Sequence, residues 1–400
     1  MSGLVQPRAD VVVIGGGIIG AACSYYLGAA GLKVCLVERH FPASGTSRAG
    51  EGLVLLWDKL PGAELSLGLA SAALWPDLAG ELDFDIGYAR RGTLLVSESE
   101  TDQAAGIAKA QALWEAGVRA EILRRGELLE LEPSLAPDLA GGVLFPDDAH
   151  LDARRATLAL IRAAQQRYHL ALHTSAESTE ICVQTNGGRR VRGVKAGGQE
   201  ILTHQVVCAA GVWSNEVARS AGLALPIRPR KGQILVTSRL SGAIHHPVLE
   251  GGYTTTVQSG DEDLQVALVA ELTEHGTLLL GSSRQFAGFD CTVSLKVMRA
   301  IAARAVRFLP TLAQAPVIRS YAGLRPWSPD HLPLIGPVES LPGFFLATGH
   351  EGAGIGLAPA TGRLIADWIS GAERPPYAGA LKPDRFELIK TNAPGEPGEI

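Results

Sequence analysis

The chain has 400 residues, of which 46% are apolar and 19% charged, and its formal net charge is −5. This composition is that of an ordinary globular protein with a large core in two or three domains, and it excludes extensive disorder. The net charge and the lack of a long basic run exclude nucleic acid and an anionic membrane surface as expected partners. A small neutral or zwitterionic substrate fits better.

The sequence also lacks membrane, signal-peptide and paired-cysteine patterns. The apolar residues 11–22 are interrupted by glycines and preceded by Asp10, so we expect neither a membrane span nor a standard signal peptide. The five cysteines are scattered without a C-x-x-C pair: Cys23, Cys35, Cys182, Cys208 and Cys291. Because four of them lie in apolar runs, we expect core cysteines in a reducing cytoplasm. No disulfide framework, metal site or iron–sulfur cluster is expected within this chain.

Residues 10–38 predict a strand, a glycine turn, a helix and a second strand. An apolar run leads into Gly15-Gly16-Gly17-Ile18-Ile19-Gly20, which has G-x-G-x-x-G spacing. Gly15 permits the tight bend, Gly17 lets phosphates approach a helix N-terminus, and Gly20 lets the helix pack on the strands. Glu38 ends the next apolar run, where its carboxylate can accept a hydrogen bond from a ribose without a 2′-phosphate. We predict a dinucleotide site, with a purely structural turn as the alternative, at Gly15, Gly17, Ile18, Ile19, Gly20, Glu38 and Arg39.

The segment 41–52 follows this unit and is rich in small and hydroxylated residues, which predicts a loop. Because it begins just beyond Glu38, we expect it to cross the same ligand and to offer backbone donors and hydroxyls to it. Its predicted contacts are Ser44, Gly45, Thr46, Ser47, Gly50, Glu51 and Gly52. An ordinary surface loop is the alternative.

The rest of the chain alternates helical and strand patterns. Apolar periodicity predicts helices at 62–79, 101–117, 152–167 with Asp152 as a cap, 294–309 and 357–370. Strand patterns cover 91–96, 171–173, 178–183, 189–194, 199–203, 205–210, 226–237, 264–270, 277–282 and 343–347. Residues 141–148 break the pattern, and proline and charge beyond Gly371 predict an irregular tail.

These elements predict an α/β fold of two domains. The N-terminal, middle and C-terminal thirds form a Rossmann-like nucleotide domain, and the insertions form a second, mainly antiparallel sheet. The predicted ranges are 1–86, 149–224 and 321–371 for the nucleotide domain, 87–148 and 225–320 for the substrate domain, and 372–400 for the tail. Ligand sites commonly lie between two such domains.

Four separated motifs together resemble a known family. They are the turn at 15–20, Cys208-Ala209-Ala210-Gly211-Val212-Trp213-Ser214, Tyr321-Ala322-Gly323-Leu324-Arg325-Pro326 and Gly349-His350-Glu351-Gly352-Ala353-Gly354-Ile355-Gly356-Leu357-Ala358-Pro359. Over nearly residues 8–371 the chain resembles the FAD-dependent D-amino-acid oxidase superfamily, with its glycine and sarcosine oxidases. The resemblance implies FAD bound by the nucleotide domain. It also implies further contacts at Val183, Ala209, Ala210, Gly211, Trp213, Gly323, Arg325, Gly349, His350, Gly352, Gly354, Ile355 and Gly356.

Within the superfamily, the segments 44–52, 228–235 and 350–357 look most like the β subunits of D-hydroxyproline dehydrogenase, opine oxidase and hydrogen cyanide synthase. The resemblance implies a complex with a larger flavin-type α subunit and a small subunit that carries an iron–sulfur cluster. An FMN at a subunit interface is left open. The chain would oxidise the substrate in the cytoplasm, or peripherally at the inner membrane through the complex, and its electrons would leave through the partners.

Oxidation of a Cα–N bond needs a neutral amine, a C–H bond directed at flavin N5 and a group that holds the carboxylate. The resemblance to glycine oxidases makes Arg325 this clamp, since a guanidinium binds a carboxylate bidentately. A structural ion pair is the alternative. Backbone N–H groups of the turn at 349–356 are expected to stabilise the negative N1–C2=O edge of the reduced flavin.

Three further residues are candidates for the substrate pocket. His350 could orient the substrate, with a structural hydrogen bond as the alternative. Glu51, like Glu351, lies in a glycine-rich loop and either contacts the amine or faces solvent. Tyr253 falls where the substrate domain of relatives lends a tyrosine to the pocket, with core packing as the alternative.

Several other functions compete with this hypothesis. A stand-alone oxidase or D-amino-acid dehydrogenase would turn over rapidly with oxygen as a single chain. A nicotinamide-dependent dehydrogenase would lack flavin absorbance, and a flavin-holding scaffold would keep the activity of the complex when Arg325 is replaced. No hydrolytic triad stands out, and no metal is expected at His245-His246 because the pair lacks a carboxylate at ligand spacing. The sequence does not distinguish D-hydroxyproline from an opine or another secondary amine.

Overall fold

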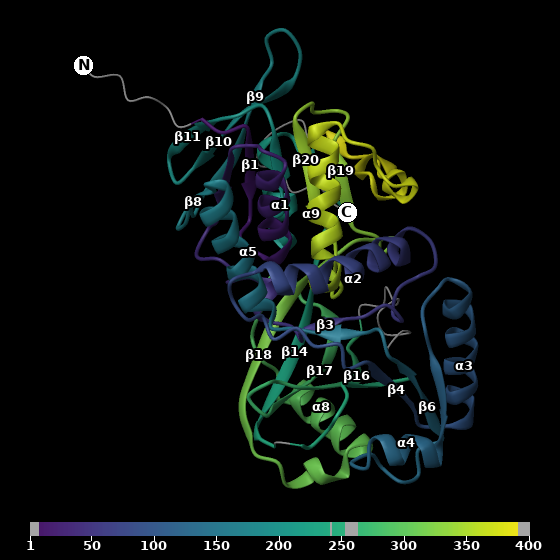
Figure 1. The fold of residues 1–400 in the computed structure, drawn as a ribbon. Coiled ribbons are helices and arrows are strands. Elements are labelled where there is room, and N and C mark those ends of the chain that lie inside the picture. The colour runs from purple at the N-terminus through teal and green to yellow at the C-terminus, as the bar shows by residue number, and fades with distance from the viewer. Residues whose placement is uncertain (1–7, 241, 253–262, 391–400) are drawn as a thin grey trace.

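The computed structural model describes residues 8–240, 242–252 and 263–390, which form two lobes around two large sheets (Figure 1). The upper lobe of Figure 1 contains a six-stranded sheet in the order β19-β20-β12-β1-β2-β8. Its strands are β1 (Val11–Ile14), β2 (Val34–Val37), β8 (Ala171–His173), β12 (Val206–Cys208), β19 (Leu334–Pro337) and β20 (Phe344–Thr348). All pairs are parallel except β19 with β20, as in an open nucleotide-binding sheet.

Both faces of this sheet are covered, because its central strands are apolar throughout. Every residue of β1 and β2 is buried. One face packs against α1 (Ile18–Ala29), α2 (Ala63–Glu81), α5 (Ala153–Tyr168) and α9 (Gly354–Ser370). The other face packs against β9 (Thr179–Gln184), β10 (Arg190–Ala196), β11 (Gln199–Leu202) and α6 (Ser214–Ser220). The helices α1 and α9 touch at Gly362, where a Cβ would lie 2.6 Å from the Ala22 backbone.

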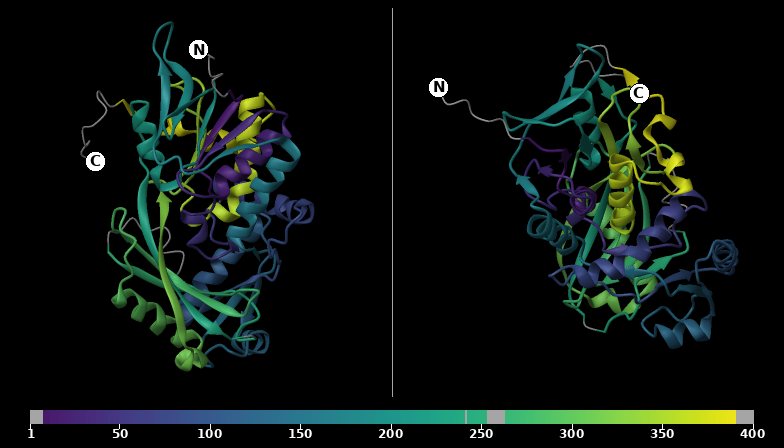
Figure 2. Two further views of the ribbon diagram at one scale, coloured as in Figure 1. Left: turned by 90° about the vertical axis from the view of Figure 1, so that its left-hand side faces the viewer. Right: turned by 45° about the horizontal axis from the view of Figure 1, so that its top comes forward.

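The lower lobe contains an eight-stranded sheet in the order β18-β14-β17-β16-β15-β4-β6-β5. Its strands are β4 (Thr93–Ser97), β5 (Glu121–Arg124), β6 (Gly141–Phe145), β14 (Arg228–Arg239), β15 (Val248–Glu250), β16 (Gln265–Leu272), β17 (Thr277–Phe286) and β18 (Val317–Trp327). The pairs are antiparallel except β15 with β4. The helices α3 (Glu100–Glu115), α4 (Arg125–Leu131) and α8 (Leu295–Phe308) belong to this lobe. The long strands β14 and β18 run up toward the other lobe (Figure 2, left).

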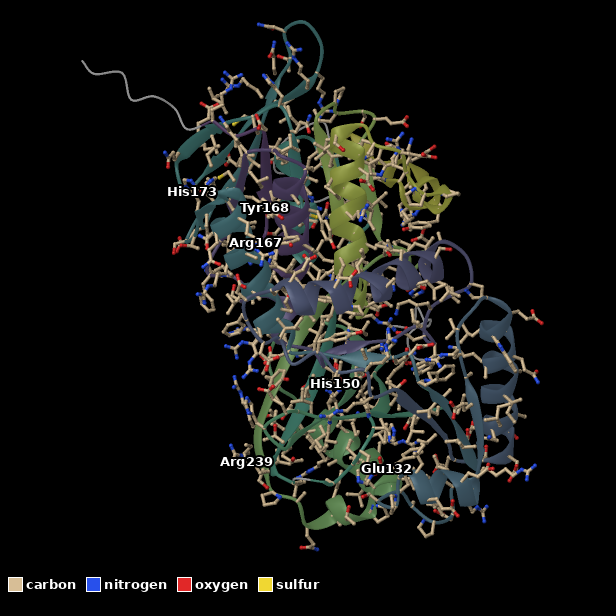
Figure 3. All side chains as sticks on the ribbon, in the orientation of Figure 1. Glu132, His150, Arg167, Tyr168, His173 and Arg239 are labelled. Carbon is tan, nitrogen blue, oxygen red and sulfur yellow. The ribbon has the colours of Figure 1, made fainter. Side chains whose placement is uncertain are left out.

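A short two-stranded pair lies at the junction of the lobes. It consists of β3 (Leu53–Val54) and β7 (Ala149–His150), and Figure 3 marks its position by the label of His150. The strand β3 follows directly on Glu51 and Gly52, so this pair anchors the end of the predicted loop between the two sheets.

The structure confirms the predicted fold class and alters three local expectations. Residues 141–145 of the segment expected to break the pattern form β6, while residues 146–148 lie between β6 and β7; neighbouring carbonyls leave no room for a Cβ at Gly141 and Gly142. The helix expected from residue 357 begins at Gly354. The tail expected to be irregular folds into the 3-10 turns Pro376–Leu381 and Pro383–Arg385, with Ala378 and Leu381 buried.

The predicted domain boundary between residues 320 and 321 falls inside β18, which pairs with β14 along its length. Within the ranges described, no helix has the length and apolar character needed to cross a membrane.

Candidate active site

A cavity of about 630 Å³ is lined by residues of both lobes, a size typical of small-molecule sites. It extends from the glycine turn after β1 to the strands β14 and β18. The predicted cofactor residues that line it are Gly15, Gly17, Ile18, Ile19, Glu38, Arg39, Ser44, Gly45, Thr46, Ser47, Gly50, Glu51, Ala209, Ala210, Gly211, Trp213, Gly323, Arg325, His350, Gly352, Gly354 and Ile355. The tertiary structure thus brings together residues that are up to 340 positions apart in the chain, from Gly15 to Ile355.

The glycine turn is shaped by backbone contacts that exclude side chains. Gly15 has a φ of +110°, and a Cβ there would lie 2.4 Å from the carbonyl oxygen of Ala209. A Cβ on Gly20 would lie 1.8 Å from the carbonyl oxygen of Gly15, so Gly20 holds α1 against the turn. Gly17 is the N-cap of α1 and lines the cavity, which places the positive end of the helix there.

Glu38 lies beside this turn because β2 ends at Val37, which pairs with Ile14 of β1. Its carboxylate accepts the N–H of Gly16 at 2.6 Å and the N–H of His40 at 2.9 Å. Each carboxylate oxygen has a further lone pair, so Glu38 can also accept a hydrogen bond from a ribose hydroxyl.

The loop after Glu38 is tied to both ends of the cavity. The Ser47 Oγ accepts the N–H of Ile18 at 2.9 Å, and the Thr46 Oγ1 donates to the carbonyl oxygen of Leu324 in β18 at 2.6 Å. The loop therefore crosses the cavity from the nucleotide turn to the second sheet.

Arg325 lies at the other end of the cavity. The register of β18 with β14 sets Arg325 opposite Arg230, and Gly323 opposite Gly232. The Arg325 Nη1 donates to the carbonyl oxygen of Ser283 at 2.9 Å. A Cβ on Gly232 would lie 2.1 Å from that Nη1, so the guanidinium can cross β14 only because residue 232 is glycine. The sequence analysis did not identify Gly232, since the constraint comes from a residue of another strand.

Glu351 faces arginines. Its carboxylate lies 2.9 Å from the Arg230 Nη1, 3.9 Å from the Arg284 Nε and 3.8 Å from the His331 Nδ1. Burial opposes its ionisation, but the His331 hydrogen bond and the guanidinium groups of Arg284, Arg230 and Arg325 outweigh it and lower the pKa of Glu351. The backbone of Glu351 is left-handed, with a φ of +45°, at a cost of about 1 kcal/mol that these ion pairs offset.

His350 is buried in the cavity wall, and its Nε2 lies 3.0 Å from the Thr361 Oγ1 of α9. Burial lowers the pKa of His350 to about 3, so the ring is neutral at physiological pH. The helix α9 begins next to it at Gly354 without a side-chain cap, and Gly352 and Ile355 line the cavity. A second positive helix end therefore faces the cavity near Arg325.

Glu51 separates the main cavity from a smaller one of about 30 Å³, which it lines together with Asp58, Lys59 and Gly352. Its Oε1 is buried and has no hydrogen-bond partner among the described residues. The fourth predicted catalytic residue, Tyr253, lies outside the described ranges.

Some predicted cofactor residues do not line the main cavity: Gly20, Gly52, Val183, Gly349 and Gly356. Gly52 packs against the carbonyl oxygen of Leu151, Gly356 lines the small cavity, and Val183 packs on the core of the upper lobe. Glu351, which the sequence offered beside Glu51, also lines the cavity. Conversely, the wall contains residues that we did not predict: Ile14, Val37, His40, Ala49, Glu177, Ser178, Thr179, Glu180, Glu216, Val217, Ser220, Gly232, Pro326, Ala347 and Thr348. The segment 177–180 carries no motif that would have revealed it.

The His245-His246 pair has a carboxylate beside it that comes from a distant part of the chain. The buried Glu132 accepts the backbone N–H groups of His245 and His246 at 2.7 and 3.1 Å. This contact could not be predicted, because Glu132 is more than 100 residues away in the chain. In the part of the chain that the structure describes, no three His, Cys, Asp or Glu side chains are placed to hold a metal ion.

These features together fit FAD. One helix end and the ribose acceptor Glu38 suit the adenosine and pyrophosphate half, and the N-terminus of α9 suits the anionic edge of a flavin. Arg325 lines the same cavity and lies near Gly352, just before that helix end. The fold and the cavity define a flavoprotein oxidoreductase of the two-domain type.

The chain belongs to the FAD dependent oxidoreductase (DAO) family, whose model matches residues 10–368. It is 32% identical over 387 residues to glycine oxidase of Pseudomonas aeruginosa, covering 92% of this chain and 98% of the relative. It is 28% identical over 391 residues to an opine oxidase subunit from Rhizobium meliloti, covering 95% and 98%. The crystal structure of glycine oxidase from Geobacillus kaustophilus matches with a TM-score of 0.84 at 26% identity, over 95% of this chain and 100% of that one. This protein is an FAD-dependent oxidoreductase of amines or amino acids.

Proposed function

We propose that this chain oxidises the Cα–N bond of a secondary amino acid, such as D-hydroxyproline or an opine, as the catalytic β subunit of a multi-subunit dehydrogenase. The position of Arg325 supports the proposal most directly. Its guanidinium lines the cavity beside Gly352, where a Cβ would lie 3.6 Å from the Arg325 Nε. A carboxylate held there would lie next to the positive end of α9.

FAD, when bound, supplies the acceptor for a hydride from the substrate Cα. The chain contributes the remaining functions. Arg325 holds the substrate carboxylate and so orients the Cα–H bond. Glu51 and Glu351 both line this cavity, and since Glu351 is paired with Arg230, we assign to Glu51 the proton from the substrate ammonium group. His350 stays neutral and supports the start of α9 through Thr361.

The role as one subunit among several is supported by the likeness to the opine oxidase subunit, a relative whose name marks it as one part of an assembly. In the proposed complex a larger flavin-type subunit and a small iron–sulfur subunit receive the electrons, with FMN at a subunit interface, in the cytoplasm or at the inner membrane. The predicted boundaries of the FAD and substrate domains stay part of this proposal.

The experiment is to purify the native complex, identify its subunits and cofactors, and measure flavin bleaching without oxygen. The panel contains D-hydroxyproline, an opine, glycine and D-alanine. We expect the secondary amino acids to bleach the flavin fastest, with slow reoxidation by oxygen. If the single chain turned over rapidly with glycine and oxygen, the result would instead support a stand-alone glycine oxidase. The likeness to glycine oxidase is the reason to consider this alternative. No bleaching by any amino acid would contradict both.

A further inference from the structure

A buried acidic cluster lies behind Glu51, in the wall of the substrate end of the cavity. Glu271 of β16 is 4% exposed, and its Oε2 accepts the N–H of Gly52 at 2.8 Å. A Cβ on Gly52 would lie 3.2 Å from the Glu271 Oε1, so the carboxyl packs directly on the backbone that carries Glu51. Glu271 therefore fixes the position of Glu51 from the second sheet.

The loop at Glu51 has little freedom to move. The Leu151 N–H donates to the Gly52 carbonyl oxygen at 2.9 Å, on the side away from Glu271. A Cβ on Gly281 of β17 would lie 2.3 Å from the Glu51 Oε1, so this oxygen packs closely against the sheet. Because the Gly52 backbone is bonded through both its N–H and its carbonyl oxygen, the preceding residue, Glu51, is held in place at the cavity wall.

A buried carboxyl group that feels the charge of a second one is ionised only at a high cost. Burial raises the pKa of Glu271 to about 8, the Gly52 N–H opposes the rise, and the charges of Glu51 and Asp152 add to it. Burial, with the charges of Glu51 and Glu271, also raises the pKa of the Tyr321 phenol, while Arg319 opposes that rise. Near pH 7 Glu271 is therefore mainly a neutral carboxylic acid and Tyr321 a neutral phenol.

We propose that Glu271 is a positioning residue for the proton transfer from the substrate amine. Its carboxyl group accepts the Gly52 N–H and so holds the peptide that follows Glu51, with no second negative charge added behind Glu51. This inference rests on the proposed function and assigns a role to a residue that touches neither the substrate nor FAD.

The step balances without a further reactant. An N–H bond of the substrate ammonium breaks, an O–H bond forms on the Glu51 carboxylate, and the nitrogen keeps the electron pair. That pair forms the C=N bond as the Cα–H pair leaves as a hydride to bound FAD. Glu271 keeps its proton throughout.

An ionised Glu271 would place a second negative charge beside Glu51 and hold the proton on the ammonium group. The charged groups that reach Glu271 from neighbouring elements are Glu51 of the loop and Asp152 at the start of α5, and Tyr321 of β18 feels its field. The rate of amine oxidation should therefore fall above pH 8. Without this effect the rate would rise with pH, because more of the substrate would be present as the neutral amine.

The test is the pH profile of flavin reduction in the complex without oxygen, for the wild type, Glu271→Gln and Glu271→Ala. We expect the wild-type rate constant to fall up to about tenfold per pH unit above pH 8. Glu271→Gln keeps an oxygen for the Gly52 N–H but cannot ionise, so its rate should match the wild type at pH 7 within about twofold and show no such fall. In Glu271→Ala the rate constant of flavin reduction should be about one tenth of the wild-type value or less at every pH, because the side chain that holds Glu51 in position is missing.

The matched control is Glu132→Gln. Glu132 is also a buried glutamate that accepts backbone N–H groups, but it lies near the lower end of the lower lobe (Figure 3). This variant should keep the wild-type profile. A second measurement does not need turnover: the affinity of 2-aminoisobutyrate, which has no Cα–H bond, should rise above pH 8 in the wild type and stay constant in Glu271→Gln.

Each outcome separates the two proposals. If no amino acid bleaches the wild-type flavin, the proposed function is wrong. If the wild type turns over but its rate does not fall above pH 8, or if Glu271→Gln retains the fall, the role of Glu271 is wrong and the proposed function stands. Should Glu271→Gln not fold, the wild-type profile and the 2-aminoisobutyrate affinity still decide the inference.

Discussion

The two ends of the cavity are built by different means. At the nucleotide end, the shape depends on backbone atoms: Gly15 and Gly20 leave no room for a Cβ, and Glu38 bonds to backbone N–H groups. At the substrate end, charged side chains from separate strands and turns meet, as Arg230 and Glu351 do at 2.9 Å. Substitutions at the nucleotide end should therefore act through steric clashes, and those at the substrate end through the loss of charge. We also expect FAD binding and substrate binding to be disrupted separately.

The largest expected effect is that of Gly20→Ala at the nucleotide end. The new Cβ would lie 1.8 Å from the Gly15 carbonyl oxygen, so we expect the free energy of unfolding to fall by about 3 kcal/mol or more and FAD to be lost. FAD content by absorbance and stability by urea titration measure this. Gly80→Ala is the control, because it also lies in a helix but meets nothing within 4 Å, and it should stabilise by about 0.5–1 kcal/mol.

Arg325→Ala should spare FAD binding and damage substrate binding. We expect the apparent dissociation constant of the substrate to rise at least about 100-fold, roughly 3 kcal/mol, with an intermediate effect for Arg325→Lys. Stopped-flow flavin reduction measures it. The control Arg119→Ala removes an exposed arginine paired with Asp147 and should change nothing. If Arg325→Ala weakened FAD binding as much as substrate binding, the two ends of the cavity would not be separable.

Glu38→Ala should weaken the binding of FAD and leave the binding of the substrate unchanged. The variant removes the acceptor for two backbone N–H groups and for the ribose, and we expect about 2 kcal/mol, or roughly 30-fold, in FAD affinity. Fluorescence titration of the apoprotein with FAD measures it. Once saturated with FAD, the variant should bind the substrate like the wild type; a large rise in the substrate dissociation constant would show that the ends are coupled.

The smallest effect at neutral pH is that of His350, which acts on stability only as the pH falls. Burial lowers its pKa from 6.5 to about 3, so the unfolded chain binds this proton first as the pH falls. As the pH falls from 6.5 to 3, the free energy of unfolding should therefore decrease by up to about 1.4 kcal/mol per pH unit. This contribution to the pH dependence should be absent in His350→Gln. Urea unfolding at several pH values measures it. His204→Gln, at an exposed position, should keep the wild-type slope.

The nucleotide end was the more predictable of the two. Its turn, strand and acidic residue lie within 10–38, and local spacing alone indicates their contacts. The prediction of Arg325 required a family resemblance, and Gly232 was missed because its constraint is a guanidinium on a different strand. The sequence patterns also failed to predict the strand at 141–145, where pairing with two neighbouring strands explains the glycines.

The amino-acid sequence by itself determined the βαβ unit of residues 10–38, because its strands, turn and helix are neighbours in the chain, and the order of such elements indicated the fold class. Only the tertiary structure decided which charges meet: Glu271 on the Gly52 N–H, Glu351 among arginines and Glu132 beneath two histidines. The physical reason is that burial and charge pairing depend on residues brought together from distant strands. The spacing of residues along the sequence does not indicate those distances in space.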